Sequence, residues 1–435
     1  MKTRVSLIQL PPGGFFPISL GYIAASLKSH NVDTTLEDLS VKETKNHKQV
    51  LSRIRKFRPH LVGFTAYQRN IREVLRLAAL IKKVDQGVIT IIGGPQVTFM
   101  PKEALSEMPS IDVLCRGEGE VVLPALCDCL HNGRGMETVK SIAFKKNGTV
   151  VETEAGALQK NLDDFASPYQ AGLVDFLNYK RAIMLTSRGC PFNCHFCYTP
   201  NAYRRTVRYH SAERVLEDLA ICVSHQVAQV FVADPSFTAN RASALKILRG
   251  IIKKRWKLHI WCETRADLVD RELLAIMAEA GVSHIAYGLE TVDKKVMEAI
   301  NKKIDLKKFK QVVKWTQELG MNAEVFTLYG LPQQTFQSAC ETLEFVKSMK
   351  VPIISNSSGQ QLELYFGTHI HDQMEEFGIH PLNKQRPLYL SPATEFGTGF
   401  MNKQELTLIQ RHYMAEQMLD QMLINKTDQA GTLCG

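Results

Sequence analysis

Alternation of short apolar runs with segments of helical periodicity constrains the fold of this chain more than any other feature. The first series has five strand-like runs with amphipathic segments between them, at residues 5–10, 32–37, 61–65, 88–92 and 113–115. Strands that are separated by helices pair in parallel, and the helices cover both faces of the sheet. Residues 1–140 are therefore predicted to form an α/β domain with a doubly wound, Rossmann-like parallel sheet.

A second alternating series begins at Ala182 and has six strand-like runs, at residues 182–186, 229–233, 258–262, 284–288, 323–329 and 351–355. Six strand–helix units are too few to close an eight-stranded barrel. The series predicts a partial (β/α)6 TIM-type barrel over residues 181–355. Residues 141–180 are expected to form a hairpin around Asn147-Gly148 and a linker. Residues 356–435 are expected to form a small C-terminal segment that shapes the substrate site.

Three of the ten cysteines stand apart from the rest. Cys190, Cys194 and Cys197 have the spacing C-x3-C-x2-C and lie directly after the first barrel strand. Three thiolates in one tight loop can bind three irons of a 4Fe-4S cluster, which leaves the fourth iron without a protein ligand. The alternative is a zinc site, which needs a fourth ligand and usually takes it from a second paired motif. His195 could supply that ligand, but its position among the cysteines would make the geometry cramped.

The loop resembles the signature of radical S-adenosylmethionine (SAM) enzymes, in which an aromatic residue precedes the third cysteine, as Phe196 does here. The resemblance implies that the amino and carboxylate groups of SAM chelate the open iron. It also implies that one electron from the cluster cleaves SAM and produces a 5′-deoxyadenosyl radical. In such enzymes the cofactors carry the difficult chemistry, while the protein supplies position and excludes water.

Motifs similar to those of the same family follow four later barrel strands. Each motif alone is more typical of a helix cap, but their order and spacing support the resemblance over residues 182–355. It implies that the planar guanidinium of Arg265 pairs with the SAM carboxylate, that Glu290 contacts the ribose or amino group, and that Leu331 lies near the adenine. The residues expected to bind SAM are Phe196, Asp234, Ser236, Arg265, Glu290 and Leu331.

The first 140 residues resemble the cobalamin-binding domain that precedes the radical domain in one large subfamily. The matching segments are residues 17–24, 61–65, 92–95 and 116–120. Small residues at strand ends let a bulky corrin approach the backbone. The resemblance implies that Gly93, Gly94 and Glu118 contact cobalamin.

The motif Asp-x-His-x-x-Gly, whose histidine binds cobalt in other cobalamin enzymes, does not occur in this sequence. The lower face of cobalt would then meet the loop at residues 67–70, with Arg69 as its expected neighbour. A surface position for Arg69 at the start of a helix is the alternative. Loss of corrin binding by the whole domain is another.

Composition excludes few function classes. The formal net charge is +9, and the densest basic group is Lys302, Lys303, Lys307, Lys308 and Lys310. We expect this group to be a solvated helix face rather than a nucleic-acid site. A positive surface would also suit an anionic cofactor or an acidic electron donor, and charge does not decide between them. The electron donor that we expect is of the flavodoxin or ferredoxin type. No apolar run reaches the length of about 18 residues that a membrane span needs. We therefore predict a cytoplasmic protein.

Three functions remain open at this stage. The leading hypothesis is a cobalamin-dependent methyltransferase that acts on an unactivated carbon of a small-molecule or peptide biosynthetic intermediate. The alternative is radical cyclisation, epimerisation, dehydration or oxidation, with cobalamin as redox partner or absent. A third possibility is a corrin or redox carrier that does not cleave SAM. The sequence predicts no catalytic acid or base, and the C-terminal candidates for substrate contacts are Tyr365, His369, His371 and Tyr389.

Overall fold

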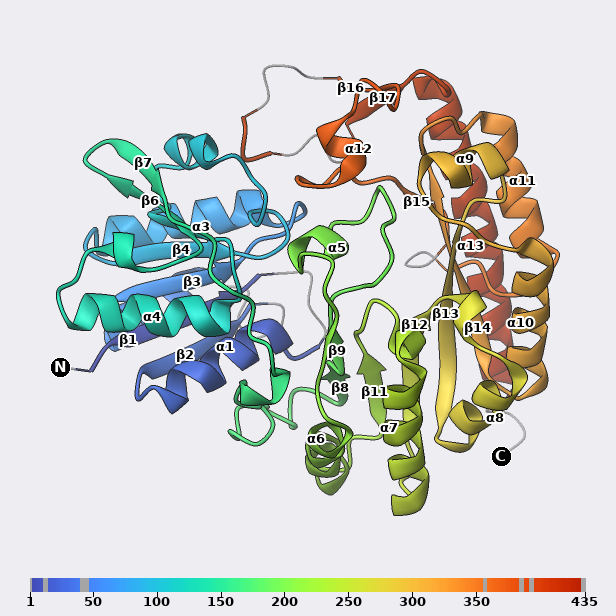
Figure 1. Ribbon diagram of the computed structural model, residues 1–435, viewed down its shortest axis with the longest axis horizontal. Coiled ribbons are helices and arrows are strands. Elements are labelled where there is room, and N and C mark those ends of the chain that lie inside the picture. Colours follow the sequence, from blue (N-terminus) through green and yellow to red (C-terminus); the bar gives the residue numbers. More distant parts are fainter. Residues whose placement is uncertain are drawn as a thin grey trace.

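The computed structural model describes residues 2–10, 15–39, 47–354, 358–382, 387–390 and 395–431. Two large sheets organise it, one from the N-terminal part and one from the middle of the chain (Figure 1). Among the described residues, no helix is both long and apolar enough to cross a membrane.

The N-terminal sheet has seven strands in the order β2-β1-β3-β4-β5-β6-β7. The first five run parallel: β1 (Arg4–Gln9), β2 (Asp33–Asp38), β3 (Leu61–Thr65), β4 (Ile89–Gly93) and β5 (Val113–Cys115). One face buries α1 (Ile18–Ser29) and α4 (Gly119–His131), and the other buries α2 (His47–Phe57) and α3 (Ile71–Val84). The sheet is therefore doubly wound, as predicted.

The predicted hairpin forms and extends this sheet. Its strands β6 (Ile142–Lys146) and β7 (Thr149–Glu152) are antiparallel, and β6 pairs with β5. Asn147 and Gly148 both have positive φ angles, 50° and 79°, which suits a two-residue hairpin turn. The hairpin therefore continues the N-terminal sheet, and the expected domain boundary at residue 140 stays a prediction.

The second sheet has six strands in the order β15-β14-β13-β12-β11-β8, all parallel. They are β8 (Arg181–Met184), β11 (Gln229–Val232), β12 (His259–Thr264), β13 (Val282–Glu290), β14 (Asn322–Tyr329) and β15 (Gln360–Gln361). The helices packed on its convex face are α6 (Ala212–Ser224), α7 (Arg241–Lys254), α8 (Arg271–Glu279), α10 (Leu306–Glu318) and α11 (Phe336–Lys347). The sheet curls without closing (Figure 1), which confirms the partial barrel.

The sixth strand was predicted in the wrong place. Residues 351–354 form no strand, residue 355 lies outside the described residues, and β15 takes the sixth position instead. Val351 and Ile353 are buried in the barrel core, so their alternation reflects packing rather than pairing. Pro352 between them cannot donate a ladder hydrogen bond.

The C-terminal segment packs against the barrel and the cysteine loop. It contains α12 (His369–Asp372), β16 (Ile379–Pro381), β17 (Phe396–Thr398) and α13 (Lys403–Gly431). Helix α13 packs beside α11, and the ring of Tyr413 stacks on that of Tyr329, with centroids 6.2 Å apart. This helix therefore belongs to the barrel core.

A short ribbon closes the base of the cysteine loop. Strands β9 (Ser187–Arg188) and β10 (Arg208–Tyr209) pair in antiparallel fashion. Gly189 follows β9 with φ of 105°, and a Cβ atom there would overlap the backbone carbonyl of Thr206. Only glycine therefore lets the chain turn from the ribbon into the loop.

We predict that Gly189→Ala lowers the free energy of unfolding by about 1–3 kcal/mol, because it combines a strained φ with a backbone clash. Urea unfolding gives the stability, and iron bound per chain after reconstitution reports the loop. Gly133→Ala is the matched control, since Gly133 has φ of 63° and open space around it. Equal losses in both variants would contradict the clash at Gly189.

Candidate active site

The three cysteines lie in the loop between β9 and α5 (Thr199–Ala202) as half-buried free thiols. The loop turns on itself where the Cys197 amide donates to the Cys194 carbonyl at 3.0 Å. In the part of the chain that the structure describes, no three His, Cys, Asp or Glu side chains are placed to share one metal ion. A tetrahedral zinc site requires such convergence, whereas a 4Fe-4S cube spreads its thiolates over separate irons.

The cysteine loop is anchored on both sides through His195. Its amide donates to the Ile300 carbonyl at 3.0 Å, its Nδ1 lies 2.8 Å from the Ala299 carbonyl, and its own carbonyl accepts from the Ile370 amide at 3.1 Å. Helices α9 (Lys294–Ala299) and α12 therefore clamp the loop. This clamp fixes the orientation of the His195 ring, and the zinc alternative is disfavoured by the lack of convergent donors among the described residues rather than by these hydrogen bonds.

Two cations offset the cost of placing thiolates here. Burial raises the pKa of all three cysteine thiols, while the charges of Lys302 and Arg265 lower the pKa values of Cys190 and Cys194. Lys302 also acts on Cys197. Nearby cations favour the thiolate form that binds iron. The soft donor set and its charge environment therefore fit a 4Fe-4S cluster.

Glu290 and Lys302 form a buried ion pair beside the loop, with Oε1 and Nζ 2.7 Å apart. The two side chains are 8% and 6% exposed. Glu290 ends β13 with φ of 68°, a conformation that costs free energy in any residue with a Cβ atom. The expectation that Lys302 belongs to a solvated helix face is therefore wrong, because its ammonium neutralises Glu290.

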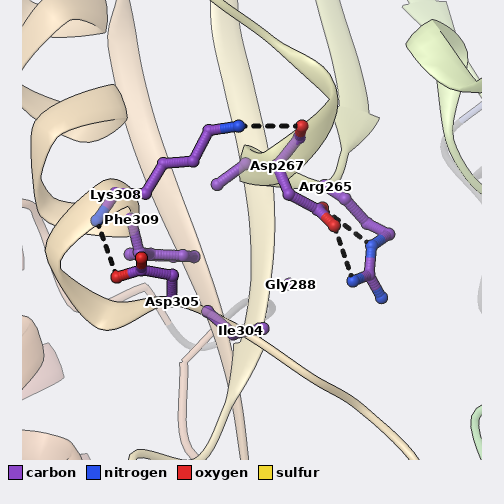
Figure 2. Close-up of a pocket in the computed structure, with 8 residues that line it drawn as sticks. Arg265, Asp267, Gly288, Ile304, Asp305, Lys308 and Phe309 are labelled. Carbon is purple, nitrogen blue, oxygen red and sulfur yellow. Dashed lines mark hydrogen bonds and ion pairs between the residues drawn. The ribbon is translucent and has the colours of Figure 1, made fainter.

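Arg265 lies over the ring of Phe192, with its guanidinium carbon 4.1 Å from the ring centroid. Its Nε and Nη2 both donate to the Asp267 carboxylate at 2.9 Å (Figure 2). Arg265 and Asp267 line a small pocket together with Gly288 and Phe309. The pocket has a volume of about 10 Å³, which is room for about one water molecule. The fork expected to hold the SAM carboxylate thus holds a carboxylate of the chain itself, and its contact with SAM stays a prediction.

Asp234 and Ser236 follow β11 and form buried hydrogen bonds beneath the cysteine loop. The buried Asp234 carboxylate accepts from the amide and the hydroxyl of both Thr186 and Ser187. Ser236 shares a buried hydroxyl contact of 3.3 Å with Thr264. Asp234 therefore fixes the strand end from which the cysteine loop departs, and a direct contact of either residue with SAM stays a prediction.

Phe196 and Leu331 are brought together by a small apolar cluster. Leu331, Ile300 and Ile370 are fully buried members of this cluster, and the partly buried ring of Phe196 packs against it. Phe196 of the cysteine loop thus packs on the same apolar cluster as Leu331, which follows β14, and the contact of Leu331 with adenine stays a prediction.

A cavity of about 820 Å³ separates the two sheets and is the largest feature of the site. Gly93 and Gly94 line it from the end of β4, and Gly189 and Tyr198 line it from the cysteine loop. Its volume lies in the upper range of ligand pockets, which run to about 1,000 Å³. Glycines at the strand ends leave backbone exposed to a flat ligand, so this wall fits a corrin.

Glu118, expected to contact cobalamin, also lines this cavity but is engaged in a buried charge network. It accepts from Arg188 Nη1 at 2.9 Å and from Arg208 Nη1 and Nη2 at 2.9 and 3.0 Å. Arg188 also donates to Glu120 at 2.5 Å. Burial raises the pKa of Glu118, but the hydrogen bonds from Arg208 and the charge of Arg188 outweigh burial and hold it below its usual range. We call these four residues the interdomain charge network.

In the loop after β3, Arg69 is exposed and lies just before α3, which is the surface position considered as the alternative above, and its contact with a corrin stays a prediction. Arg69 Nη2 pairs with Glu363 at 3.0 Å, and Arg69 is not among the residues that line the cavity. Tyr67, two residues earlier in the same loop, does line it. Arg69 therefore ties the loop to the C-terminal segment, and Tyr67 is the better candidate for contact with a bound corrin.

Glu263 is a titratable residue that the sequence did not single out. It lies in β12, and burial together with the charges of Glu290, Glu324 and Asp234 raises its pKa to about 7. A carboxylic acid that titrates near neutrality is typical of acid–base roles. The one signal in the sequence is the position of Glu263 near the carboxyl end of a predicted strand.

Two family descriptions match the chain: the radical SAM superfamily over residues 184–346 and the B12 binding domain over residues 9–127. The chain is therefore a radical SAM enzyme that carries a cobalamin-binding domain. Its cofactors are accordingly a 4Fe-4S cluster, SAM and cobalamin, as the sequence predicted.

Three known proteins illustrate the relationship. The uncharacterized methyltransferase PH0819 of Pyrococcus horikoshii is 28% identical over 375 residues, 81% of this chain and 79% of that protein. An anaerobic magnesium-protoporphyrin IX monomethyl ester cyclase of Rubrivivax gelatinosus is 28% identical over 355 residues, 77% of this chain and 62% of the cyclase. The structure of the radical SAM methyltransferase TsrM from Kitasatospora setae, with cobalamin and cluster bound, has a TM-score of 0.75 at 18% identity and covers 90% of this chain and 79% of that one. It shows a shared fold.

We predict that Glu118→Gln lowers the free energy of unfolding at pH 7 by about 3–5 kcal/mol, because Arg188 and Arg208 lose a buried carboxylate partner. The lowered pKa of Glu118 stabilises the fold above the unfolded value of about 4.3, and this stabilisation is lost as the pH falls through the folded value. The gap between wild type and variant should therefore close below about pH 4. Urea titrations at several pH values measure it. The exposed Glu154→Gln is the control, and a gap independent of pH would refute the assignment.

We predict that Lys302→Met costs about 3–5 kcal/mol of stability, because Glu290 is left with a buried, uncompensated charge. The double variant Glu290→Gln/Lys302→Met should be more stable than Lys302→Met alone. Denaturant unfolding of Glu290→Gln, Lys302→Met and the double variant, each against wild type, completes the cycle. Lys314→Met, which breaks an exposed pair with Glu318, should cost less than about 1 kcal/mol. Additive effects at Glu290 and Lys302 would show that the two side chains do not interact.

Proposed function

We propose that the chain is a cobalamin-dependent radical SAM methyltransferase that acts on an unactivated carbon. The observation that carries the proposal is the cavity between the two sheets. Residues directly after the carboxyl ends of strands in both sheets line it, Gly94 after β4 on one side and Leu185 and Ala233 after β8 and β11 on the other. In open α/β sheets such ends are where ligands bind. One shared cavity brings a corrin and the products of SAM cleavage within reach of the same substrate.

Each wall of this cavity has a separate task in the proposal. Cys190, Cys194 and Cys197 would hold the cluster, and the glycine loops after β4 and β5 would hold the corrin. When bound, the cluster would supply the electron that cleaves SAM, and cobalamin would supply the methyl group. The chain itself orients the two walls through the interdomain charge network and keeps water out by burial.

Radical ring formation is the second candidate. The cyclase relative is as similar in sequence as the methyltransferase relative, 28% in both cases, but the chain spans less than two thirds of the cyclase. The methyltransferase relative matches over more of its own length. Methyl transfer is therefore the first choice, with a small molecule or peptide as substrate and a flavodoxin- or ferredoxin-type electron donor. The cytoplasmic location stays a prediction.

Anaerobic reconstitution with iron, sulfide and cobalamin tests the proposal. We expect one cluster and one corrin per chain by absorption, and both S-adenosylhomocysteine and 5′-deoxyadenosine on incubation with SAM and a reductant. A ring-forming enzyme would release 5′-deoxyadenosine without S-adenosylhomocysteine. Cys194→Ala should abolish cluster binding, while Cys340→Ala, at a half-buried thiol outside the loop, should not. A chain that binds no corrin, or keeps its cluster without Cys194, would overturn the proposal.

A further inference from the structure

A basic surface borders the cysteine loop on the side away from the cavity. It consists of three exposed lysines just before and within the first turn of α10, and we call Lys303, Lys307 and Lys308 the lysine face. Among the described residues, neither Lys303 nor Lys307 has a carboxylate partner. Asp305 lies between them, but its carboxylate caps α10 by accepting from the amides of Lys307 and Lys308 at 2.9 and 3.1 Å.

The lysine face is joined to the cysteine loop by two short bridges. Asn301 Nδ2 donates to the Asn193 carbonyl, inside the loop, at 2.8 Å. Arg265 Nη2 donates to the Lys303 carbonyl at 3.1 Å, and its guanidinium stacks on Phe192 of the loop. Figure 2 shows Lys308 reaching back toward Asp267, whose carbonyl accepts from its Nζ at 3.1 Å. The chain segment that carries the lysines is therefore tied to the loop that carries the thiols.

This side also leaves the loop open to a partner. Pro191 and Asn193 are exposed within the loop. The opposite side faces the cavity, and α12 covers the upper side, where the ring of His369 lies 4.4 Å from that of His195. Because one-electron transfer between proteins falls off steeply with distance, a protein donor must approach where the loop is exposed.

We propose that the lysine face docks a small acidic electron-carrier protein that reduces the cluster. The inference rests on the proposed radical SAM function and adds the place and charge of its partner. One electron leaves the reduced flavin or iron–sulfur group of the carrier and is gained by the oxidised cluster, and no atom is transferred. The carboxylate of Asp267 is neutralised by Arg265, so the net charge that an approaching protein meets is positive. Complementary charge of this kind raises association rates by about 10–1,000-fold at low salt.

The test compares two triple variants of the reconstituted holoenzyme with equal changes in net charge. Lys303→Glu/Lys307→Glu/Lys308→Glu reverses the lysine face. Lys253→Glu/Lys254→Glu/Lys257→Glu reverses three exposed lysines before β12, at the opposite ends of the strands. A bacterial flavodoxin is the probe. Its dissociation constant is measured by calorimetry, and cluster reduction by its hydroquinone is measured by stopped-flow absorbance. Photoreduced 5-deazariboflavin, small and uncharged, reduces the cluster without docking.

We expect the lysine-face variant to lose at least about 10-fold in both flavodoxin affinity and reduction rate at low salt, with the difference fading as salt rises. Reduction by deazariboflavin should change less than about 2-fold, and the control variant should match wild type. Equal losses in both triple variants, or wild-type affinity in the lysine-face variant, would overturn the docking site. So would tighter binding of a short DNA duplex than of flavodoxin. Failure of deazariboflavin to reduce the wild-type cluster would instead overturn the proposed function.

Discussion

Arg188 carries a buried positive charge between the two sheets, and both of its carboxylate partners lie at the start of α4 in the N-terminal part of the chain, Glu118 as the N-cap residue and Glu120 in the first turn. The rings of Tyr22 and Phe165 lie over its guanidinium at 5.5 and 4.7 Å. Removing such a charge from water is costly, and the cost is recovered only while the partners stay in place. An arrangement of the sheets that separates Arg188 from its partners is therefore strongly disfavoured. Charge pairing, rather than apolar contact alone, fixes their relative orientation.

The position of Arg188 in the chain makes this constraint matter for the site. It is the last residue of β9, directly before Gly189 and two residues before Cys190. The same contact that joins the sheets therefore also sets the starting point of the cysteine loop. Because the Glu118 carboxylate is paired with the two arginines, Gly93, Gly94, Gly117 and Gly119 of the wall expected to face the corrin offer backbone and shape rather than charge. Shape, more than charge, would then select the ligand on that wall.

The elements that the sequence predicted well are those whose signal is local. Five parallel strands, the Asn147-Gly148 hairpin and the cysteine loop each depend on a periodicity or motif within a few residues. The features that the sequence did not indicate are ion pairs with residues outside the local pattern. Lys302 stands beside exposed lysines and differs from them only because Glu290, twelve residues earlier, needs a countercharge. Arg69 is drawn away from the cavity by Glu363, 294 residues later, which no local pattern could indicate.

Cations lie on the thiol side of the cysteine loop and carboxylates lie toward the barrel interior, and Glu290 interacts with both groups. Its carboxylate pairs with Lys302, on the side of the thiols, while its charge also raises the pKa of Glu263 toward the barrel interior. The strained φ at Glu290 is what turns the end of β13 so that one side chain reaches both regions. Cations then favour thiolates on one side, and carboxylates accumulate on the other. SAM carries both an ammonium and a carboxylate group, so a site that presents both signs of charge suits it better than a site of one sign alone.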